Sequence, residues 1–220
     1  MSDEIRERCA RVADLGTGPI SDAMEAMKLR RTVIIGMQFM GPESTASLVG
    51  PAFTVRQGFK ARSVSHDDNR ARHPEAVNVL AQPGDVVVVD NDGRTDIGMF
   101  GENLAMRAKS RGIAGFIVHG AVRDREAIRR LGFTIVSRGA SPVSSKWELE
   151  TIEMNEPIAI DGVRIRPGDV LYADADGVIV LPKEDCLAIF DRAEEIKRSE
   201  EKNREQLYGA AAGTTARAQR

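Results

Sequence analysis

The sequence has few aromatic residues and little excess of either charge, and both shortages limit the partners that it can bind. Phe, Trp and Tyr together make up 5% of its 220 residues. Proteins that stack nucleic-acid bases need aromatic platforms, so this composition argues against that class. The formal net charge of −2 and the pI near 6.0 give no bulk attraction to a polyanion. We therefore expect no nucleic-acid partner.

Cysteines and long apolar runs are also scarce. Cys9 and Cys186 stand alone, without the spacing of a metal site or a disulfide framework, which predicts two reduced thiols. No apolar run approaches the roughly 18 residues that a membrane span needs. Residues 1–16 show a charged amphipathic pattern that is unlike a signal peptide. We expect a cytoplasmic protein without a membrane partner.

The overall composition is that of a globular protein, with 42% hydrophobic and 29% charged residues. We predict a single α/β domain over residues 1–208. It divides into N-terminal helices over 3–29, a core over 33–182 and a charged C-terminal helix over 183–207. Residues 209–220 lack a periodic apolar pattern, which predicts a mobile tail.

Strand and helix patterns alternate in the core. Residues 86–89 have a strand pattern, residues 102–111 a helix pattern and residues 113–118 a second strand pattern. Such a unit forms a right-handed crossover between parallel strands. Ligands bind at the carboxyl ends of strands in these units, which here bear Gly101–Asn103 and His119–Asp124.

Shorter segments complete the core. Further strands are predicted at residues 48–56 and 133–136, while residues 32–41 are too irregular for an assignment. Asp161-Gly162 predicts a tight hairpin turn within a strand-rich segment. The predicted loops are residues 58–73 and 137–146, with a short helix at 74–80.

A four-residue motif occurs twice in the chain. Pro83-Gly84-Asp85-Val86 and Pro167-Gly168-Asp169-Val170 each precede a short apolar run and then an acidic turn, at Asp90–Gly93 and Asp174–Gly177. Asp and Gly supply the side-chain hydrogen bonds and positive φ that tight turns need. A calcium loop is excluded, because glycine follows the first acid too soon and no glutamate closes the loop.

The stretch from Gly101 to Glu126 organises the rest of the chain. A ten-residue helix rises about 15 Å, and a six-residue strand returns about 20 Å. If the helix packs on the sheet, the end of the strand returns beside the first turn of the helix. Glu102, the free amides of Asn103 and Leu104, and the pair Arg123-Asp124 then meet at one edge.

These residue types suit the binding of a small oxo acid. Asp124 is a hard oxygen donor for Mg²⁺ or Mn²⁺, and Arg123 offers a fork that matches a carboxylate. The amides after Gly101 can bind the same anion, and Glu102 can act as a base. The alternative is structural: a surface ion pair at Arg123-Asp124 and a dipole partner at Glu102.

The histidines leave two interpretations open. His119, at the predicted end of a strand, can act as an acid or base near neutral pH or serve as a hydrogen-bonded structural residue. His66 and His73 lie seven residues apart in a polar loop without matching ligands, which argues against a metal site there.

Several motifs in order give the chain a resemblance to a known family. From Ile20 to Pro182 it resembles the class II pyruvate aldolases, a family that includes 4-hydroxy-4-methyl-2-oxoglutarate aldolase and shares its fold with the regulator of ribonuclease activity A. The motifs are ISDAM, GPAFTV, Asp68-Asn69, PGDVVVVD, GENLA with RG and GAVRD after it, and PGDVLYADADGVIVLP.

The resemblance implies a layered swivelling β/β/α-type fold with helices flanking a mixed central sheet and a long C-terminal helix. It implies a metal-dependent lyase that releases pyruvate from a 4-hydroxy-2-oxo acid by retro-aldol cleavage and that also decarboxylates oxaloacetate. Asp124 would anchor Mg²⁺ through waters, Arg123 would contact the oxo acid, and amides from Gly101 to Leu104 would hold its carboxylate. A homotrimer or a hexamer is expected.

Two positions depart from the family pattern. Glu102 stands where aspartate is usual, twenty residues before Arg123-Asp124, and His119 replaces the acid that commonly precedes Gly-Ala-Val-Arg-Asp. A neighbour's C-terminal helix can also complete such sites. The candidates for that role are Glu194, Glu195, Glu200 and Glu201.

Two other functions are alternatives to the aldolase. One is a non-catalytic regulator like the ribonuclease regulator; the acid at 102 with Arg123-Asp124 favours the enzyme. The other is methyl transfer to a quinone, for which no glycine-rich nucleotide loop follows a strand.

Overall fold

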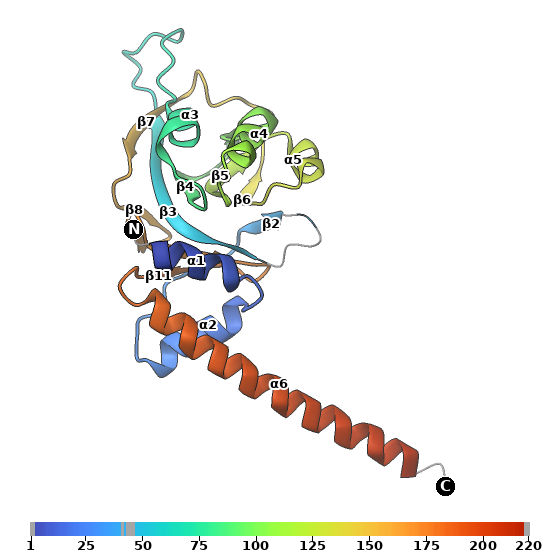
Figure 1. Cartoon of the computed structure of the whole chain (residues 1–220). Coiled ribbons are helices and arrows are strands. Elements are labelled where there is room, and N and C mark those ends of the chain that lie inside the picture. Colours follow the sequence, from blue (N-terminus) through green and yellow to red (C-terminus); the bar gives the residue numbers. More distant parts are fainter. Residues whose placement is uncertain (1–2, 41, 43–46, 218–220) are drawn as a thin grey trace.

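A computed structural model describes residues 3–40, 42 and 47–217, and its strands form a curled mixed sheet (Figure 1). Within this part of the chain, nine strands pair in one sheet in the order β1-β11-β10-β3-β4-β5-β6-β2, and β7 pairs with β3. The central strands β3 (Leu48–Phe59), β4 (Val86–Gly98), β5 (Gly115–Val122) and β6 (Ile135–Ala140) are parallel to one another. The predicted α/β class with a mixed central sheet is confirmed.

Shorter strands complete the sheet and a separate hairpin. The antiparallel strands of the sheet are β1 (Val33–Ile34), β2 (Gln38–Met40), β7 (Leu149–Met154), β10 (Val170–Ala173) and β11 (Val178–Leu181). The hairpin consists of β8 (Ile158–Ile160) and β9 (Val163–Ile165), joined by Asp161-Gly162 as predicted. The segment that had no sequence assignment thus supplies two edge strands.

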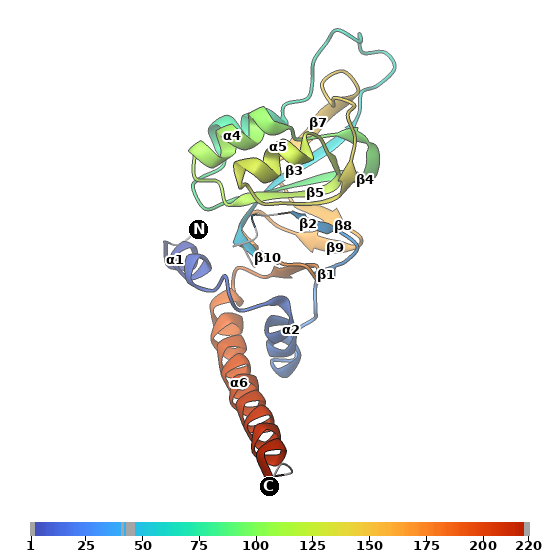
Figure 2. The ribbon, with the colours of Figure 1, turned by 90° about the vertical axis from the view of Figure 1, so that its right-hand side faces the viewer.

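Helices flank the sheet on both sides (Figure 2). Helices α4 and α5 lie over the central strands, whereas α1, α2 and α6 lie beyond β10. The helices are α1 (Asp3–Arg11), α2 (Thr17–Ala26), α3 (His73–Glu75), the π-helical η1 (Ala76–Leu80), α4 (Glu102–Ser110), α5 (Arg125–Leu131) and α6 (Cys186–Arg217). None of them, within the residues described, has both the length and the apolar character for crossing a membrane.

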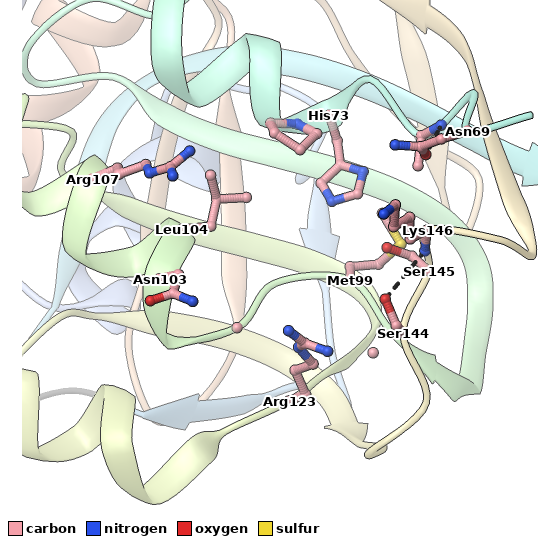
Figure 3. Close-up of a pocket in the computed structure, with 14 residues that line it drawn as sticks. Asn69, His73, Met99, Asn103, Leu104, Arg107, Arg123, Ser144, Ser145 and Lys146 are labelled. Atoms are coloured by element: carbon pink, nitrogen blue, oxygen red, sulfur yellow. Dashed lines mark hydrogen bonds between the residues drawn. The ribbon is translucent and has the colours of Figure 1, made fainter.

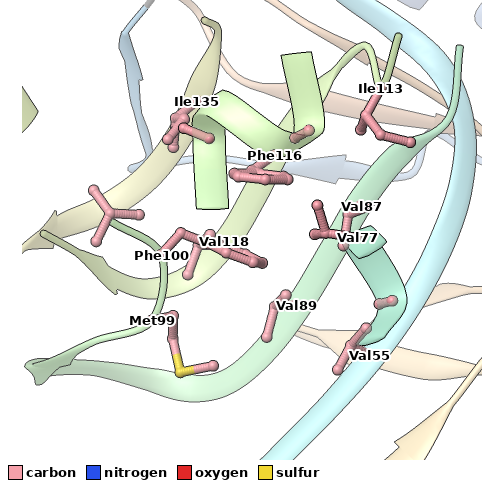
Figure 4. Close-up of a cluster of buried hydrophobic side chains, with 14 of the residues drawn as sticks. Val55, Val77, Val87, Val89, Met99, Phe100, Ile113, Phe116, Val118 and Ile135 are labelled. Atoms are coloured by element: carbon pink, nitrogen blue, oxygen red, sulfur yellow. The ribbon is translucent and has the colours of Figure 1, made fainter. Parts of the chain in front are cut away.

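Alternating side chains on the parallel strands feed two separate apolar layers. Val87 and Val89 of β4 face the cluster under α4 and α5, while Val86 and Val88 face the cluster between the two halves of the sheet. Successive side chains of a strand point to opposite faces, so a strand that is buried on both sides must be apolar throughout. Figure 4 shows the cluster under α4 and α5.

Strand β3 joins the two halves of the sheet. Its first residues pair with β10, its middle residues with β4 and its last residues with β7. Gly50 allows the close approach near the start of β3, because a Cβ there would lie 2.4 Å from the carbonyl oxygen of Gly84. A residue without a side chain is therefore needed where β3 passes the turn at Gly84.

Both copies of the repeated motif form the same tight turn. Gly84 and Gly168 have φ values of 83° and 85°. The carboxylates of Asp85 and Asp169 each accept a hydrogen bond from a backbone N–H three residues earlier, at 2.7 and 2.8 Å. The structural interpretation of the motif is confirmed.

Several predicted boundaries are wrong, and β4, for example, continues to Gly98 beyond the predicted end at residue 89. Strand β6 continues to Ala140, so the predicted loop at 137–146 begins too early, because pairing with β5 extends to that residue. Helix α6 continues to Arg217, past the predicted end at Leu207 and through most of the predicted mobile tail; the alanines at 210–212 favour a helix there. Residues 218–220 of the predicted tail lie outside the described residues, and the domain boundaries stay a prediction.

The aromatic cluster under the helices generates a stability prediction. Phe116 is fully buried and stacks on Phe100 with ring centroids 4.0 Å apart. Phe116→Ala should lower the free energy of unfolding by about 3–5 kcal/mol, because it removes buried contacts and leaves a cavity. Leu207→Ala, at a side chain that is 73% exposed, is the control and should change it by less than about 0.5 kcal/mol. Equal effects of the two substitutions in denaturant unfolding would contradict this packing.

Candidate functional site

The two polar clusters of the central stretch meet at one edge of the sheet. Strand β5 ends at Val122, and Asp124 then adopts a left-handed conformation with φ 58° before α5. Its Oδ2 accepts a hydrogen bond of 3.1 Å from the backbone N–H of Glu102, the first residue of α4. A carboxylate is favourable there, because the first N–H groups of a helix have no partner within it.

Gly101 makes this close approach possible. Its backbone is extended, but a Cβ would lie 2.6 Å from Asp124 Oδ2 and 2.7 Å from Arg123 Nε. Arg123 Nε lies 3.6 Å from the same Oδ2, and the two side chains are 39% and 43% exposed. The glycine is therefore required by space and not by backbone conformation.

The predicted amide donors are only partly free. The N–H of Leu104 donates to the carbonyl oxygen of Gly101 at 3.1 Å, and that of Glu102 is bound to Asp124. For the N–H of Asn103, no acceptor is found in the described part of the chain. The start of α4 thus offers one of the two amides that the sequence predicted.

The predicted residues divide between two hollows that share Arg123. A cavity of about 240 Å³ is lined by Gly101, Asn103, Leu104 and Arg123 among others (Figure 3). A wider, open hollow of about 520 Å³ is lined by Glu102, Arg123 and Asp124. The side chain of Arg123 forms part of both walls.

The smaller cavity is a cationic site. Arg107, Arg123 and Lys146 line it, together with the polar side chains of Asn69 and Ser144, and none of its described lining residues is acidic. The sequence did not predict Arg107, Lys146 or Ser144 as site residues. Arg107 lies on α4, and Ser144 and Lys146 lie between β6 and β7, in a loop that no local pattern places beside α4. Asn69 was seen only as part of the family motif. This arrangement suits an anion.

The open hollow has carboxylates that can be tested against the needs of a metal ion. Its acidic residues are Glu102, Asp124 and Glu126, and its basic residues are Arg123, Arg125 and Arg130. Among the residues described, no three acidic, histidine or cysteine side chains form a ready-made metal cluster. Mg²⁺ keeps several waters and binds through one or two carboxylates. The donors present fit Mg²⁺ held in that way by Asp124, with Glu102 beside it.

The structure does not bring His119 to these hollows. Strand β5 continues to Val122, so the prediction that the strand ends at His119 is wrong. The Nδ1 atom of His119 lies 2.9 Å from Asp90 Oδ1, and its Nε2 lies 3.4 Å from Asp161 Oδ1 in the β8–β9 turn. This contact joins β5 to the hairpin and matches the structural interpretation of His119.

His73 lines the smaller cavity, where the sequence gave no sign of it. The residue is 4% exposed and packs edge-on against Phe100 at 5.5 Å between ring centroids. Burial lowers the pKa of its imidazole from about 6.5 to about 4, and a hydrogen bond with the Met99 backbone opposes this shift. The polar sequence around it concealed that it begins α3 and turns inward.

Comparison with known proteins settles the family. The model of the RraA-like family, described as Aldolase/RraA, matches residues 17–180. The chain belongs to the RraA-like family. The family resemblance predicted from the motifs is thereby confirmed.

Relatives within this family carry different names. A Halalkalibacterium halodurans protein provisionally named 4-hydroxy-4-methyl-2-oxoglutarate aldolase is 38% identical over 74% of this chain and 71% of its own length. Protein DlpA of Legionella pneumophila is 29% identical over 91% of this chain, which spans only 32% of DlpA. The structure is also similar to the crystal structure of Streptomyces coelicolor RraAS2, which is described as an unusual member of the RNase ES inhibitor RraA protein family. The TM-score is 0.74 and the sequences are 28% identical, and the match covers 93% of this chain and 97% of RraAS2.

The buried imidazole predicts a pH dependence of stability. Because the pKa of His73 is lower in the folded chain, the unfolded chain binds more protons between pH 6.5 and 4. Folding should therefore lose stability as the pH falls through this window, by about 3 kcal/mol in total from this residue. In urea unfolding at several pH values, His73→Phe should show a shallower loss than the unmodified protein. Parallel curves would contradict the assignment.

Proposed function

We propose that this RraA-like protein is a metal-dependent lyase that cleaves a 4-hydroxy-2-oxo acid and releases pyruvate. The observation that carries the proposal is the shared Arg123, with an acid-free cationic cavity on one side and the Asp124–Glu102 pair on the other. The relative in Halalkalibacterium halodurans, named for this reaction, supports it.

The cationic cavity would hold the oxo acid. The planar guanidinium of Arg123 can bind the carboxylate or oxo group through two N–H donors. The unengaged N–H of Asn103 at the start of α4 adds a donor that the helix dipole favours for an anion. Together these groups fix the orientation of the reacting carbon atoms.

The reaction itself needs a proton acceptor and stabilisation of negative charge. The hydroxyl on C4 loses its proton, the C4–O bond becomes a carbonyl, and the C3–C4 bond breaks. Its electron pair passes to C3 and onto the C2 oxygen as an enolate, and a proton added at C3 gives pyruvate. Arg123 stabilises the developing charge, and Glu102 receives the hydroxyl proton. Asp124 would hold a divalent cation, which would supply Lewis-acid stabilisation.

Oxaloacetate decarboxylation uses the same enolate. Here the C3–C4 bond breaks with loss of CO₂, and the electron pair again passes to C3 and the C2 oxygen. A site that stabilises this enolate would therefore serve both reactions. The second substrate also lacks a hydroxyl group on C4, which makes it a useful probe of the site.

Pyruvate release tests the proposal directly. The protein should release pyruvate from 4-hydroxy-4-methyl-2-oxoglutarate and from oxaloacetate when Mg²⁺ or Mn²⁺ is present, and a chelator should abolish both reactions. Absence of metal-dependent release from either compound would sink the proposal. The similarity to RraAS2, a member of a ribonuclease-inhibitor family, would then favour the alternative function, a non-catalytic regulator.

Asp124→Asn separates the charge of this residue from its structural role. Asparagine tolerates the left-handed conformation and still offers an oxygen to the N–H of Glu102, so the fold should persist. It loses the negative charge that a divalent cation requires, so pyruvate release should fall by at least about 100-fold. Thermal unfolding serves as the control. Full activity with an unchanged melting temperature would remove Asp124 from the metal site.

Gly101→Ala tests the close approach at the start of α4. Its new methyl group would overlap Asp124 Oδ2 and Arg123 Nε, so the pair must move and kcat/KM should fall by about tenfold or more. Gly18→Ala in α2 is the matched control, because nothing lies within 4 Å of a Cβ at that position. The control should keep full activity. Equal activity of the two variants would show that the Asp124–Arg123 geometry does not matter.

A further inference from the structure

Arg107 brings an unpaired positive charge to the wall of the cationic cavity. Within the described part of the chain its guanidinium has no carboxylate or carbonyl partner, and only its backbone oxygen accepts hydrogen bonds, from Ser110 and Arg111. An arginine on an open surface needs no partner, but Arg107 lines a hollow that two further cations also line. Positive charges that gather around a hollow attract an anion into it.

The other two cations of the cavity already have contacts of their own. The Nε atom of Arg123 lies 3.6 Å from Asp124 Oδ2, and the ammonium group of Lys146 lies 4.1 Å from the centroid of the Trp147 ring. A carboxylate that binds at Arg123 therefore leaves Arg107 without a counter-charge, because no described lining residue is acidic. A ligand with two negative groups matches this wall better than a ligand with one.

Helix α4 places Arg107 one turn beyond the N–H group that is proposed to bind the first carboxylate. Asn103 and Arg107 are four residues apart, so they share a face of the helix at a spacing of about 6 Å along its axis. Figure 3 shows the side chains of Arg107 and Arg123 on different sides of the cavity, with Leu104 between them in this view. The two guanidinium groups can therefore bind the two ends of one small molecule.

We propose that Arg107 binds the carboxylate remote from the oxo group and thereby selects oxo acids that carry two carboxylates. The planar guanidinium of an arginine matches a carboxylate through two N–H donors. The cavity, at about 240 Å³, lies below the roughly 300–1,000 Å³ of pockets for drug-sized ligands, which suits an acid of this size. This inference deepens the proposed lyase function, on which it rests for the identity of the reacting end of the ligand.

The proposed chemistry is compatible with this second anchor. In 4-hydroxy-4-methyl-2-oxoglutarate the remote carboxylate and the hydroxyl group are separate substituents of C4. Arg107 can hold that carboxylate in the cavity while the hydroxyl proton passes to Glu102 in the open hollow. The remote carboxylate keeps its charge throughout the cleavage, so Arg107 acts on the binding of the substrate and not on the bond that breaks.

A pair of substrates that differ only in the remote carboxylate tests the inference. In 4-hydroxy-2-oxopentanoate a hydrogen atom replaces the remote carboxylate of 4-hydroxy-4-methyl-2-oxoglutarate. Arg107→Met removes the charge but keeps an unbranched side chain of good helix propensity. It should lower the ratio of kcat/KM for the diacid to kcat/KM for the monoacid by about 10- to 100-fold, mainly through a higher KM for the diacid. Arg107→Lys, which keeps the charge without the fork, should restore part of that ratio.

The matched control removes the same charge far from the cavity. Arg11 is in α1, its side chain is 74% exposed, and its ion pair with Glu7 is only 4.0 Å. Arg11→Met should leave the ratio of the two kcat/KM values unchanged. An unchanged ratio in Arg107→Met, or an equal loss with both substrates, would overturn the inference while the proposed function stands.

Binding of unreactive acids separates this inference from the lyase proposal. 2-Oxoglutarate and 2-oxopentanoate differ in a terminal carboxylate against a methyl group, and neither has a hydroxyl group on C4 that would allow cleavage. In calorimetry with Mg²⁺ present, the unmodified protein should bind the diacid at least about tenfold more tightly, and Arg107→Met should remove that preference. Equal affinities in the unmodified protein would overturn the inference even if pyruvate is released. An Arg107-dependent preference without pyruvate release would support this anion site and overturn the lyase.

Discussion

The hydrogen bond between the carboxylate of Asp124 and the first N–H of α4 holds the candidate site together. Asp124 precedes α5, yet its side chain makes no capping bond to that helix. In its left-handed conformation the side chain reaches the neighbouring helix instead. One residue therefore fixes the starts of two helices relative to each other, and Gly101 leaves the space for it. The position of Arg123 follows, because its own N–H donates to the carbonyl oxygen of Phe100.

The sheet delivers these residues to one edge through irregular pairing. Between Asp90 and Gly98 the register of β4 against β5 shifts twice, so β4 extends beyond its regular pairing. Beyond the shifts, the N–H of Gly98 donates to Val143 and that of Met99 to Ala121. Bulges redirect a strand and are common beside active sites. Here they bring the chain before α4 close to the chain that follows β5 and β6.

Local geometry explains what the sequence could predict. The meeting of Glu102 with Arg123-Asp124 follows from the lengths of one helix and one strand, and both PGDV turns follow from turn chemistry. His73 could not be found in this way. Its burial depends on how a polar loop and the residues before α4 pack together, and no local pattern contains that information. His119 was misplaced because β5 continues past it.

The alternation of side chains along β5 explains why His119 does not line the cavity, whereas His73 does. His119 shares the strand face of Ile117, which packs in the middle of the sheet and not under the helices. His119 would therefore stay away from the hollows even if β5 ended one residue earlier. Its position on the strand directs its side chain to Asp90 and to the β8–β9 hairpin.

Arg123 separates a cavity whose charged wall residues are all cationic from an open hollow that has charges of both signs. In the proposed reaction an anionic oxo acid must be bound beside a divalent cation, and a cavity wall without carboxylates does not repel the carboxylate of the oxo acid. Arg107 and Lys146 line only the cavity, whereas Glu102 and Asp124 line only the open hollow, which Arg125 and Arg130 also line. Exposed charges are screened within about 8 Å at physiological salt, so this separation acts at short range. With a net charge of only −2, the chain has no strong overall field. Selectivity for a ligand must therefore arise from contacts inside the cavity, which Arg123 lines.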